Sequence, residues 1–348
     1  MSSVRVWGLW LGISLGLFGC GGGTDSETQT TAAKAATGLT PGNAAQLAQD
    51  RSVILPAQLK AELGGNGNID IQQRGPRIVE VSLVQAEVKD LSPLKGLRLE
   101  RLLIIDCPVT DLSPLEGMPL QMLGLRGTEV ASLYPLKGMP LVNLDLSGSK
   151  QVSDLSPLEG MPLKALYLED TNVTDLSPLK GLSLDSLYLN RCPIKDLSPL
   201  GGKTFVELNL TESPVTDFTP LRSIKARTLW IGQTAISDLS PLRESELVSL
   251  DVQFSKVTDL APLATLTTLQ RLNLEGAPVT DLSPILGLPL TRLTFTPSKV
   301  TKGMPELREM SSLVELCTRF DPPSHPALPK EEFWKQFDAG TLKEPGAP

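Results

Sequence analysis

Few residues of this 348-residue chain have side chains that could carry out chemistry. There is one histidine, His325, and there are four cysteines, Cys20, Cys107, Cys192 and Cys317. A single histidine in a proline-rich stretch excludes most catalytic triads, histidine-ligated metal sites and histidine acid–base schemes. The cysteines lack C-x-x-C spacing, which argues against a zinc knuckle and a thioredoxin-like motif. We therefore expect that the protein is not an enzyme and holds neither a metal nor another cofactor.

Serine and aspartate occur together many times, but the sequence indicates no histidine or lysine base held beside a strained turn. The segment Asp90-Leu91-Ser92-Pro93-Leu94 recurs, with small substitutions, from Asp111, Ser132, Asp154, Asp175, Asp196, Asp217, Asp238, Asp259 and Asp281. Serines without a base are capping residues rather than nucleophiles. A ladder of carboxylates could share calcium ions, but the glycine-rich nonapeptide loops of calcium-binding β-rolls are absent. Backbone capping by the aspartates is the favoured interpretation, and calcium binding is the alternative.

The spacing of these segments predicts the elements that must position any site. The copies are 21 or 22 residues apart, and each copy after the first follows a Leu-x-x-Leu-x-Leu pattern or one close to it. Alternating leucines predict a strand with one face inward, and the unit is too short to return through a long helix. In Ser92-Pro93-Leu94-Lys95-Gly96, serine can cap, proline fits the first helical position and glycine ends a 3₁₀-type turn. Each unit leaves an apolar edge for its neighbour to cover, so the sequence predicts a stacked solenoid of about 11 repeats.

This repeat resembles the leucine-rich-repeat family, and its D-L-x-P-L turn is most similar to the internalin subclass. The resemblance covers residues 78–318. It implies an α/β-type solenoid, a horseshoe with a parallel sheet on the concave face and short 3₁₀ turns on the convex face. The asparagine of the family's inner ladder is replaced by Thr, Ser, Cys or Ala. Cys107 and Cys192 hold this inward position four units apart, which is too far for a disulfide, so we expect buried free thiols.

Both ends of such a solenoid need a cap. Residues 51–77 are expected to cap the first repeat with a helix over Leu55–Leu63, whose leucines at 55, 59 and 63 share one face, and a strand at Ile69–Ile71. Residues 319–348 are expected to form the other cap and a tail. A helix over 329–338 would place Phe333, Trp334 and Phe337 against the open end. The alternative is that these aromatics dock a partner.

Function in this architecture should depend on the side chains between the inward leucines. The column between the second and third leucine positions contains three aromatic residues within four consecutive strands. Tyrosine and tryptophan are frequent interface anchors. The predicted site is a partner-binding patch of these aromatics with an acidic rim, made of Tyr167, Tyr188, Trp230, Asp145, Glu169, Glu207 and Asp251. The alternative is that the aromatics only stabilise the sheet through cross-strand contacts.

The first residues indicate export from the cytoplasm. Arg5 precedes the apolar run Val6–Phe18, as in a signal peptide. Leu17-Phe18-Gly19-Cys20 resembles the bacterial lipobox, although Phe18 stands where a small residue is usual. The resemblance implies a signal peptide at 1–19, lipid attachment at Cys20 and, because Gly21 follows, sorting to an outer membrane. Residues 20–50 would be a flexible tether. The alternative is a cleaved secretory peptide with an incidental cysteine.

The net charge of −7 and the lack of a basic block make nucleic acid an improbable partner. The sequence thus predicts a monomeric, membrane-anchored protein of the cell envelope that mediates protein–protein interaction through its concave face. It does not indicate on which side of the membrane the domain lies. A carbohydrate- or peptidoglycan-binding module and a purely structural spacer are the alternative functions.

Overall fold

The structure is a computed structural model that describes residues 54–319 and 325–344. The expected signal peptide, Cys20 and the tether lie outside these residues. Residues 52–348 form one compact unit, and a single hydrophobic cluster runs through it from Ile54 to Trp334. Among the described residues, no helix has the length and apolar character needed to cross a bilayer. Because the core is continuous within it, this unit can be studied as a separate domain.

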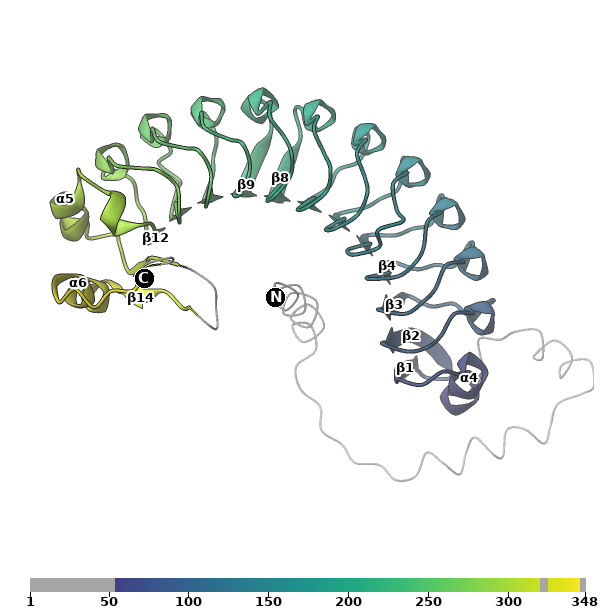
Figure 1. Ribbon diagram of the computed structural model, residues 1–348. Helices are drawn as coiled ribbons and strands as arrows, with labels where there is room; N and C mark the ends of the chain where they lie inside the picture. The colour runs from purple at the N-terminus through teal and green to yellow at the C-terminus, as the bar shows by residue number, and fades with distance from the viewer. Residues whose placement is uncertain (1–53, 320–324, 345–348) are drawn as a thin grey trace, which may run out of the picture. The chain divides into compact units, whose positions relative to one another are not determined.

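One sheet of 14 strands, ordered as in the sequence, forms the inner side of the curved solenoid (Figure 1). The strands from β2 to β13 are parallel, and an antiparallel strand pairs with each end of the series. The strands are β1 (Asn68–Arg74), β2 (Arg77–Val84), β3 (Arg101–Ile105), β4 (Met122–Gly124), β5 (Asn143–Asp145), β6 (Ala165–Tyr167), β7 (Ser186–Tyr188), β8 (Thr204–Asn209), β9 (Lys225–Trp230), β10 (Ser249–Asp251), β11 (Arg271–Asn273), β12 (Arg292–Thr294), β13 (Glu315–Cys317) and β14 (Leu328–Pro329). The predicted parallel sheet on the concave side is confirmed.

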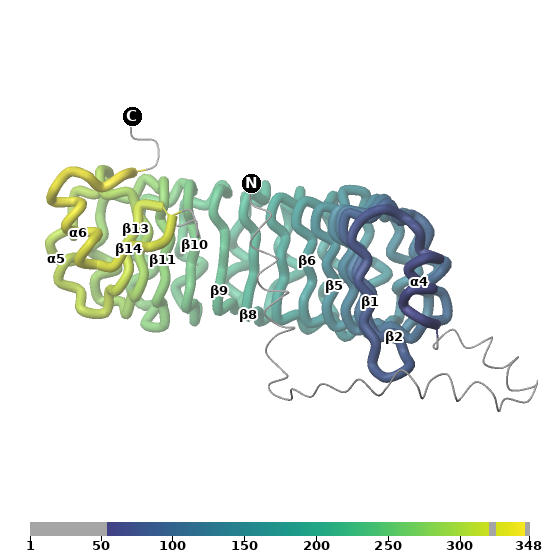
Figure 2. Tube along the Cα trace, turned by 90° about the horizontal axis from the view of Figure 1, so that it is seen from below, coloured from purple at the N-terminus to yellow at the C-terminus, as the bar shows by residue number. Residues whose placement is uncertain are grey.

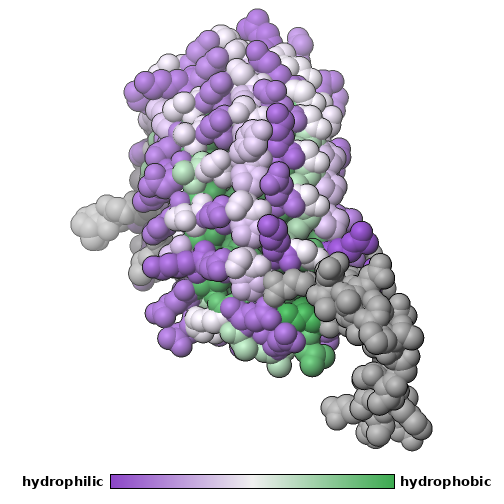
Figure 3. All heavy atoms as spheres, turned by 90° about the vertical axis from the view of Figure 1, so that its right-hand side faces the viewer, coloured by the Kyte–Doolittle hydropathy of each residue, from purple (hydrophilic) through white to green (hydrophobic). Residues whose placement is uncertain are grey.

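Short 3₁₀ turns return each strand to the next along the convex side (Figure 1), as the serine–proline segments predict. They are η3 (Ser92–Leu94), η4 (Ser113–Leu115), η5 (Tyr134–Leu136), η6 (Ser156–Leu158), η7 (Ser177–Leu179), η8 (Ser198–Leu200), η9 (Thr219–Arg222), η10 (Ser240–Leu242), η11 (Ala261–Leu263) and η12 (Ser283–Ile285). A further 3₁₀ turn, η13 (Pro297–Lys299), directly follows β12, and the helix α5 (Met304–Glu309) stands between it and β13. Gly96 follows η3 at φ 83°, a conformation that favours glycine. The outer side of the first repeats, seen in Figure 3, is mostly hydrophilic.

The leucines of each repeat hold the stack together. On β7, Leu187 faces the core and is 0% exposed, as is Leu189 just after the strand. The outer turn contributes a second layer, such as Leu200 in η8, which is also fully buried. Each repeat covers the apolar edge of the one before it, which is how an isolated 21-residue unit becomes stable.

In every turn that begins with an aspartate, this aspartate, rather than the residue two positions later, caps the backbone. The Asp90 Oδ1 atom accepts a hydrogen bond from the Ser92 amide at 2.7 Å, and the Ser92 hydroxyl donates to Oδ2 at 2.6 Å. The same aspartate-to-amide bond recurs at Asp111, Asp154, Asp175, Asp196, Asp217, Asp238, Asp259 and Asp281. The capping interpretation of the aspartate ladder is confirmed, whereas the prediction that serine itself caps is wrong.

These capped turns should make the fold sensitive to acid. Hydrogen bonds from Ser92 to Asp90 lower the pKa of that carboxyl, and those from the equivalent residues lower the pKa values of Asp111, Asp154, Asp175, Asp217, Asp238 and Asp281. A lowered folded-state pKa stabilises the fold above the unfolded pKa, near 4, and the effect is lost as pH falls through the folded pKa. We expect the urea midpoint of residues 52–348 to be flat from pH 7 to 5 and to fall below about pH 4.

The third turn provides the control for this prediction. Ser132 stands where the other turns have aspartate, and its hydroxyl accepts the Tyr134 amide at 3.3 Å, longer than the aspartate bonds. Ser132→Asp should raise the urea midpoint at pH 7, and the gain should disappear near pH 3. A gain of equal size at both pH values would contradict the electrostatic explanation.

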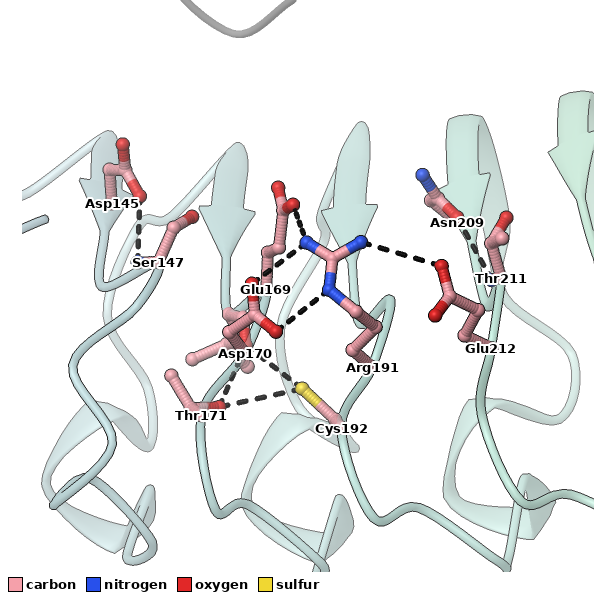
Figure 4. Close-up of polar contacts among 11 residues, drawn as sticks. Asp145, Ser147, Glu169, Asp170, Thr171, Arg191, Cys192, Asn209, Thr211 and Glu212 are labelled. Carbon is pink, nitrogen blue, oxygen red and sulfur yellow. Dashed lines mark hydrogen bonds and ion pairs between the residues drawn. The ribbon is translucent and has the colours of Figure 1, made fainter. Parts of the chain in front are cut away.

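Hydroxyl and thiol groups replace the family's asparagine in the inner ladder. The hydroxyls of Thr128 and Ser149 both donate to the Leu125 carbonyl oxygen, at 2.8 and 2.6 Å. The Thr171 hydroxyl donates to the Leu168 carbonyl oxygen at 2.7 Å, and the Cys192 thiol donates to the same oxygen at 2.8 Å (Figure 4). Short hydroxyl and thiol side chains therefore donate the hydrogen bonds that these strand-end carbonyl oxygens accept.

The described cysteines are buried free thiols, as predicted for Cys107 and Cys192. Cys317, for which the sequence offered no mate, is also free and buried. Burial raises the pKa of all three thiols, which keeps them protonated and unreactive.

The first repeat is covered by α4 (Pro56–Leu63) and the β1–β2 hairpin (Figure 2). Leu59 and Leu63 pack against the core, but Leu55 is 66% exposed. The prediction that Leu55 shares the buried face is wrong because the helix begins one residue later. Leu55 has extended backbone angles and only its carbonyl oxygen joins the helix, accepting the Leu59 amide at 2.9 Å.

The last repeat is covered by α5 (Met304–Glu309) and α6 (Lys330–Asp338) (Figure 1). Phe333 is 0% exposed and its ring lies 5.8 Å from that of Phe295 in the core. Trp334 is also buried, with the Arg308 guanidinium 4.5 Å from its ring centre, while Phe337 is 38% exposed. Two of the three aromatics of α6 thus fill the end of the core.

Candidate partner-binding surface

The three aromatics of the concave column form one row of stacked rings, the aromatic row: Tyr167 on β6, Tyr188 on β7 and Trp230 on β9. The register pairs Tyr167 with Tyr188, Tyr188 with Asn209 and Asn209 with Trp230. The ring centres of Tyr167 and Tyr188 are 5.0 Å apart, and those of Tyr188 and Trp230 are 5.8 Å apart. The Trp230 ring therefore reaches past the intervening Asn209 to contact Tyr188. All three side chains remain partly exposed on the concave side.

Glu207 on β8 holds the tip of the central ring. The Tyr188 hydroxyl donates to the Glu207 Oε2 atom at 2.8 Å, and the Ser186 hydroxyl donates to the same atom at 3.3 Å. Burial, with Glu207 next in effect, raises the pKa of Tyr188 and raises that of Tyr167 to about 12. Both phenols therefore stay neutral hydrogen-bond donors at physiological pH.

Asp145 and Asp251, the column residues nearest the ends of the aromatic row, cap their own strands. Each accepts a hydrogen bond at Oδ1 from the amide two residues later, Ser147 at 2.8 Å and Gln253 at 2.9 Å. The Asp251 Oδ2 atom also accepts from the Asn273 side-chain amide at 2.9 Å. Asp145 is only 5% exposed, and burial raises the pKa of its carboxyl. It is thus a buried cap rather than the exposed rim residue expected from the sequence.

Glu169 is also buried, at 9% exposed, because an arginine outside the predicted site covers it. Figure 4 shows Arg191 between the carboxylates of the repeats on either side of it, Glu169 and Asp170 after β6 and Glu212 after β8. Its guanidinium donates to both Asp170 oxygens at 2.7 Å, donates to Glu169, and lies 3.6 Å from Glu212. The hydrogen bonds from Arg191 lower the pKa of Asp170. Of the expected acidic rim, Glu207 and Asp251 are only partly buried, whereas Asp145 and Glu169 are buried.

Removal of the Arg191 guanidinium should destabilise the domain. The Glu169 side chain is only 12% exposed and would lose its cation, so we expect Arg191→Ala to cost about 1–2 kcal/mol at pH 7, discounted for the partial exposure of the arginine. The loss should shrink below pH 4, where Asp170 becomes protonated in both proteins. Arg74→Ala, which breaks an exposed pair with Glu100, is the control and should cost less than about 0.5 kcal/mol. Equal losses in urea unfolding would contradict this role of Arg191.

One column of the concave edge was missed by sequence reasoning. It contains the residues that follow the strand ends in left-handed backbone, Gln85, Asp106, Asp170, Arg191, Glu212, Gln233 and Phe254. Glycine takes the same place in other repeats, at positions 127, 148 and 276. The recurrence of glycine at this position, in three of the repeats, is the signal that could have identified it. Phe254 is 50% exposed and lies over Gly276, so the column adds a further exposed aromatic near the aromatic row.

Three polar atoms on the concave side are buried without a hydrogen-bond partner among the described residues: Arg126 Nη1, Ser147 Oγ and Asn190 Oδ1. Asn190 follows β7 two residues after Tyr188, so the two side chains emerge on the same face. It is 6% exposed. A buried acceptor without a donor is costly in isolation, and it suits a bound group that brings an N–H or O–H.

In residues 54–319 and 325–344, no group of three His, Cys, Asp or Glu side chains is arranged to hold a metal ion. The concave side instead offers aromatic rings, carboxylates and an amide in adjacent columns. Such a surface is suited to recognition.

No protein-family profile matches the sequence, and no curated protein matches it. Solved structures do match. An internalin, InlF, from Listeria monocytogenes is 27% identical over 66% of this chain and 71% of that chain, with a TM-score of 0.59. The chain has an internalin-like leucine-rich-repeat fold.

Two further structures are more distant. The functional domain of InlJ from Listeria monocytogenes is 20% identical over 66% of this chain and 55% of that chain, with a TM-score of 0.49. A leucine-rich-repeat protein of Leptospira interrogans is 20% identical over 73% of this chain and 74% of that chain, with a TM-score of 0.37. The internalin-like fold supports a protein–protein interaction module in general terms.

Proposed function

We propose that this protein is a lipid-anchored component of the cell envelope that binds a protein partner through the concave face of its leucine-rich-repeat domain. The observation that carries the proposal is the aromatic row. Tyrosine and tryptophan rings supply large, rigid contact areas at interfaces. Here three of them stack within four consecutive repeats yet stay partly exposed, with centres 5.0 and 5.8 Å apart.

The polar groups around the row support a protein ligand. Glu207 and Asn190 lie in the two columns beside the rings, and Asp251 lies at the end of the row. Polar groups therefore surround an aromatic centre. This is the usual arrangement of a protein interface. The six carboxylates Asp145, Glu169, Asp170, Glu207, Glu212 and Asp251 outnumber the one arginine that pairs among them, Arg191.

The partner class can be tested with purified residues 52–348. The domain, immobilised, is exposed to solubilised envelope proteins and, separately, to purified peptidoglycan and envelope polysaccharide. We expect saturable capture of a protein that polysaccharide does not compete. Capture of peptidoglycan or polysaccharide alone would favour the carbohydrate-binding alternative. Failure to bind any of them, with no ligand raising the melting temperature, would favour a structural spacer.

The lipid anchor is a separate part of the proposal and rests on the lipobox-like sequence that ends at Cys20. Two or three acyl chains on this cysteine would hold the protein stably on a membrane. Full-length protein produced in cells fed with labelled palmitate should incorporate the label and sediment with membranes, and Cys20→Ala should do neither. An unlabelled protein secreted into the medium would favour the cleaved secretory peptide. Separation of the two membranes would test the outer-membrane location.

A further inference from the structure

We propose that the aromatic row receives an arginine side chain of the protein partner, held between Glu207 and Asn190. This inference rests on the proposed function, because it names the group that the concave face recognises. Three independent features favour a planar cation with several N–H donors: the rings of the aromatic row, the carboxylate of Glu207 beside it and the unpartnered amide oxygen of Asn190.

The rings are the first feature. Aromatic faces attract cations, and guanidinium groups stack on them better than ammonium groups do. Trp230 contacts the ring of Tyr188, and no second aromatic ring of the described residues is stacked on it. In the described part of the chain, no lysine or arginine makes a cation–π contact with Trp230. The tryptophan of α6, Trp334, does make such a contact, with Arg308. The face of Trp230 is thus available to the proposed arginine of the partner.

The carboxylate is the second feature. Glu207 accepts hydrogen bonds from two neutral hydroxyls, those of Tyr188 and Ser186, and these contacts leave its charge without a counterion. Arg191, which lies one repeat before Glu207, is already bound by Glu169, Asp170 and Glu212. A partner cation that reached Tyr188 would thus find an uncompensated carboxylate at the edge of the same ring.

The amide is the third feature. Asn190 lies in the column on the other side of the row from Glu207, and its Oδ1 atom is buried without a donor. Acceptors on both sides of a stack of rings fit a guanidinium, which carries five N–H donors in one plane, better than they fit an ammonium. The unpartnered donor Arg126 Nη1 follows β4, three strands away from β7, so it does not compete for the same cation.

The test selects displayed random peptides of 12 residues on immobilised residues 52–348. Peptides are kept if they lose binding to the Tyr188→Ala/Trp230→Ala variant. We expect them to share an arginine whose replacement by citrulline, which keeps the shape but removes the charge, weakens binding at least about 10-fold. Replacement by lysine should weaken it less, about 3- to 10-fold.

Variants of the domain, combined with the peptide variants, complete a double-mutant cycle. Glu207→Gln keeps a hydrogen-bond acceptor for the Tyr188 hydroxyl. It should weaken the binding of the arginine peptide about 10-fold but leave the binding of the citrulline peptide unchanged. Asp154→Asn changes the net charge of the domain equally, on the convex turn, and should leave both peptides unchanged. Unfolding curves establish that both variants are folded.

The outcomes separate this inference from the proposed function. Two results would overturn the arginine site while concave binding remained. The first is that row-dependent peptides bind equally well with citrulline in place of arginine. The second is that Glu207→Gln and Asp154→Asn weaken peptide binding equally. A selection without any peptide that depends on the row would overturn both.

Discussion

The Tyr188→Ala/Trp230→Ala variant of residues 52–348 is expected to lose partner capture by about 100-fold or more while it remains folded. Interface aromatics of this kind each contribute about 2 kcal/mol or more when truncated, and the two rings act together because they are in contact. Capture should be measured as a dissociation constant by titration of the immobilised domain with the purified partner.

The fold should survive because both side chains lie on the concave side and leave the core untouched. Loss of the ring contacts should cost about 1–2 kcal/mol of unfolding free energy. The matched control is Tyr134→Ala, which removes a 68% exposed tyrosine from the convex turn η5 and should not change capture. Unchanged capture by the double variant would show that the aromatic row only stabilises the sheet.

The second large effect concerns the opposite face of the same strand. Leu187→Ala should lower the unfolding free energy by about 2–5 kcal/mol, because the leucine is 0% exposed in the continuous core and its truncation leaves a cavity between repeats. Chemical denaturation of residues 52–348 is the measurement.

Val206→Ala on β8 is the control for this loss. Val206 is 51% exposed, so its truncation should change stability by less than about 0.5 kcal/mol. A loss of similar size at both positions would contradict a core formed by the inward leucines. Neighbouring residues 187 and 188 thus have separable roles, the first in stability and the second in binding.

Much of the fold could be predicted from the sequence because the repeat is nearly constant in length. A strict 21- or 22-residue spacing places equivalent residues at the same strand position, so the column containing Tyr167, Tyr188 and Trp230 follows from counting. The 3₁₀ turns were predictable for a similar reason, since Ser-Pro-Leu segments recur at one position in the repeat.

The electrostatics of the surface could not be predicted in the same way. Arg191 and Asp170 occupy left-handed backbone, which turns their side chains toward each other and onto Glu169. Counting places residues in columns but does not give the backbone angles at a strand end. The burial of Asp145 was missed because an aspartate in a strand resembles an exposed charge until its local hydrogen bond to Ser147 is known.

The most direct test of the account places a photo-cross-linking amino acid at one of two positions of the full-length protein in intact cells. Thr228 lies on the concave face of β9, paired with Glu207 and Ser249, and Glu159 is exposed after the convex turn η6. Binding through the concave face predicts that irradiation links the partner to position 228 and not to position 159. Adducts from 159 with none from 228 would contradict binding through the concave face.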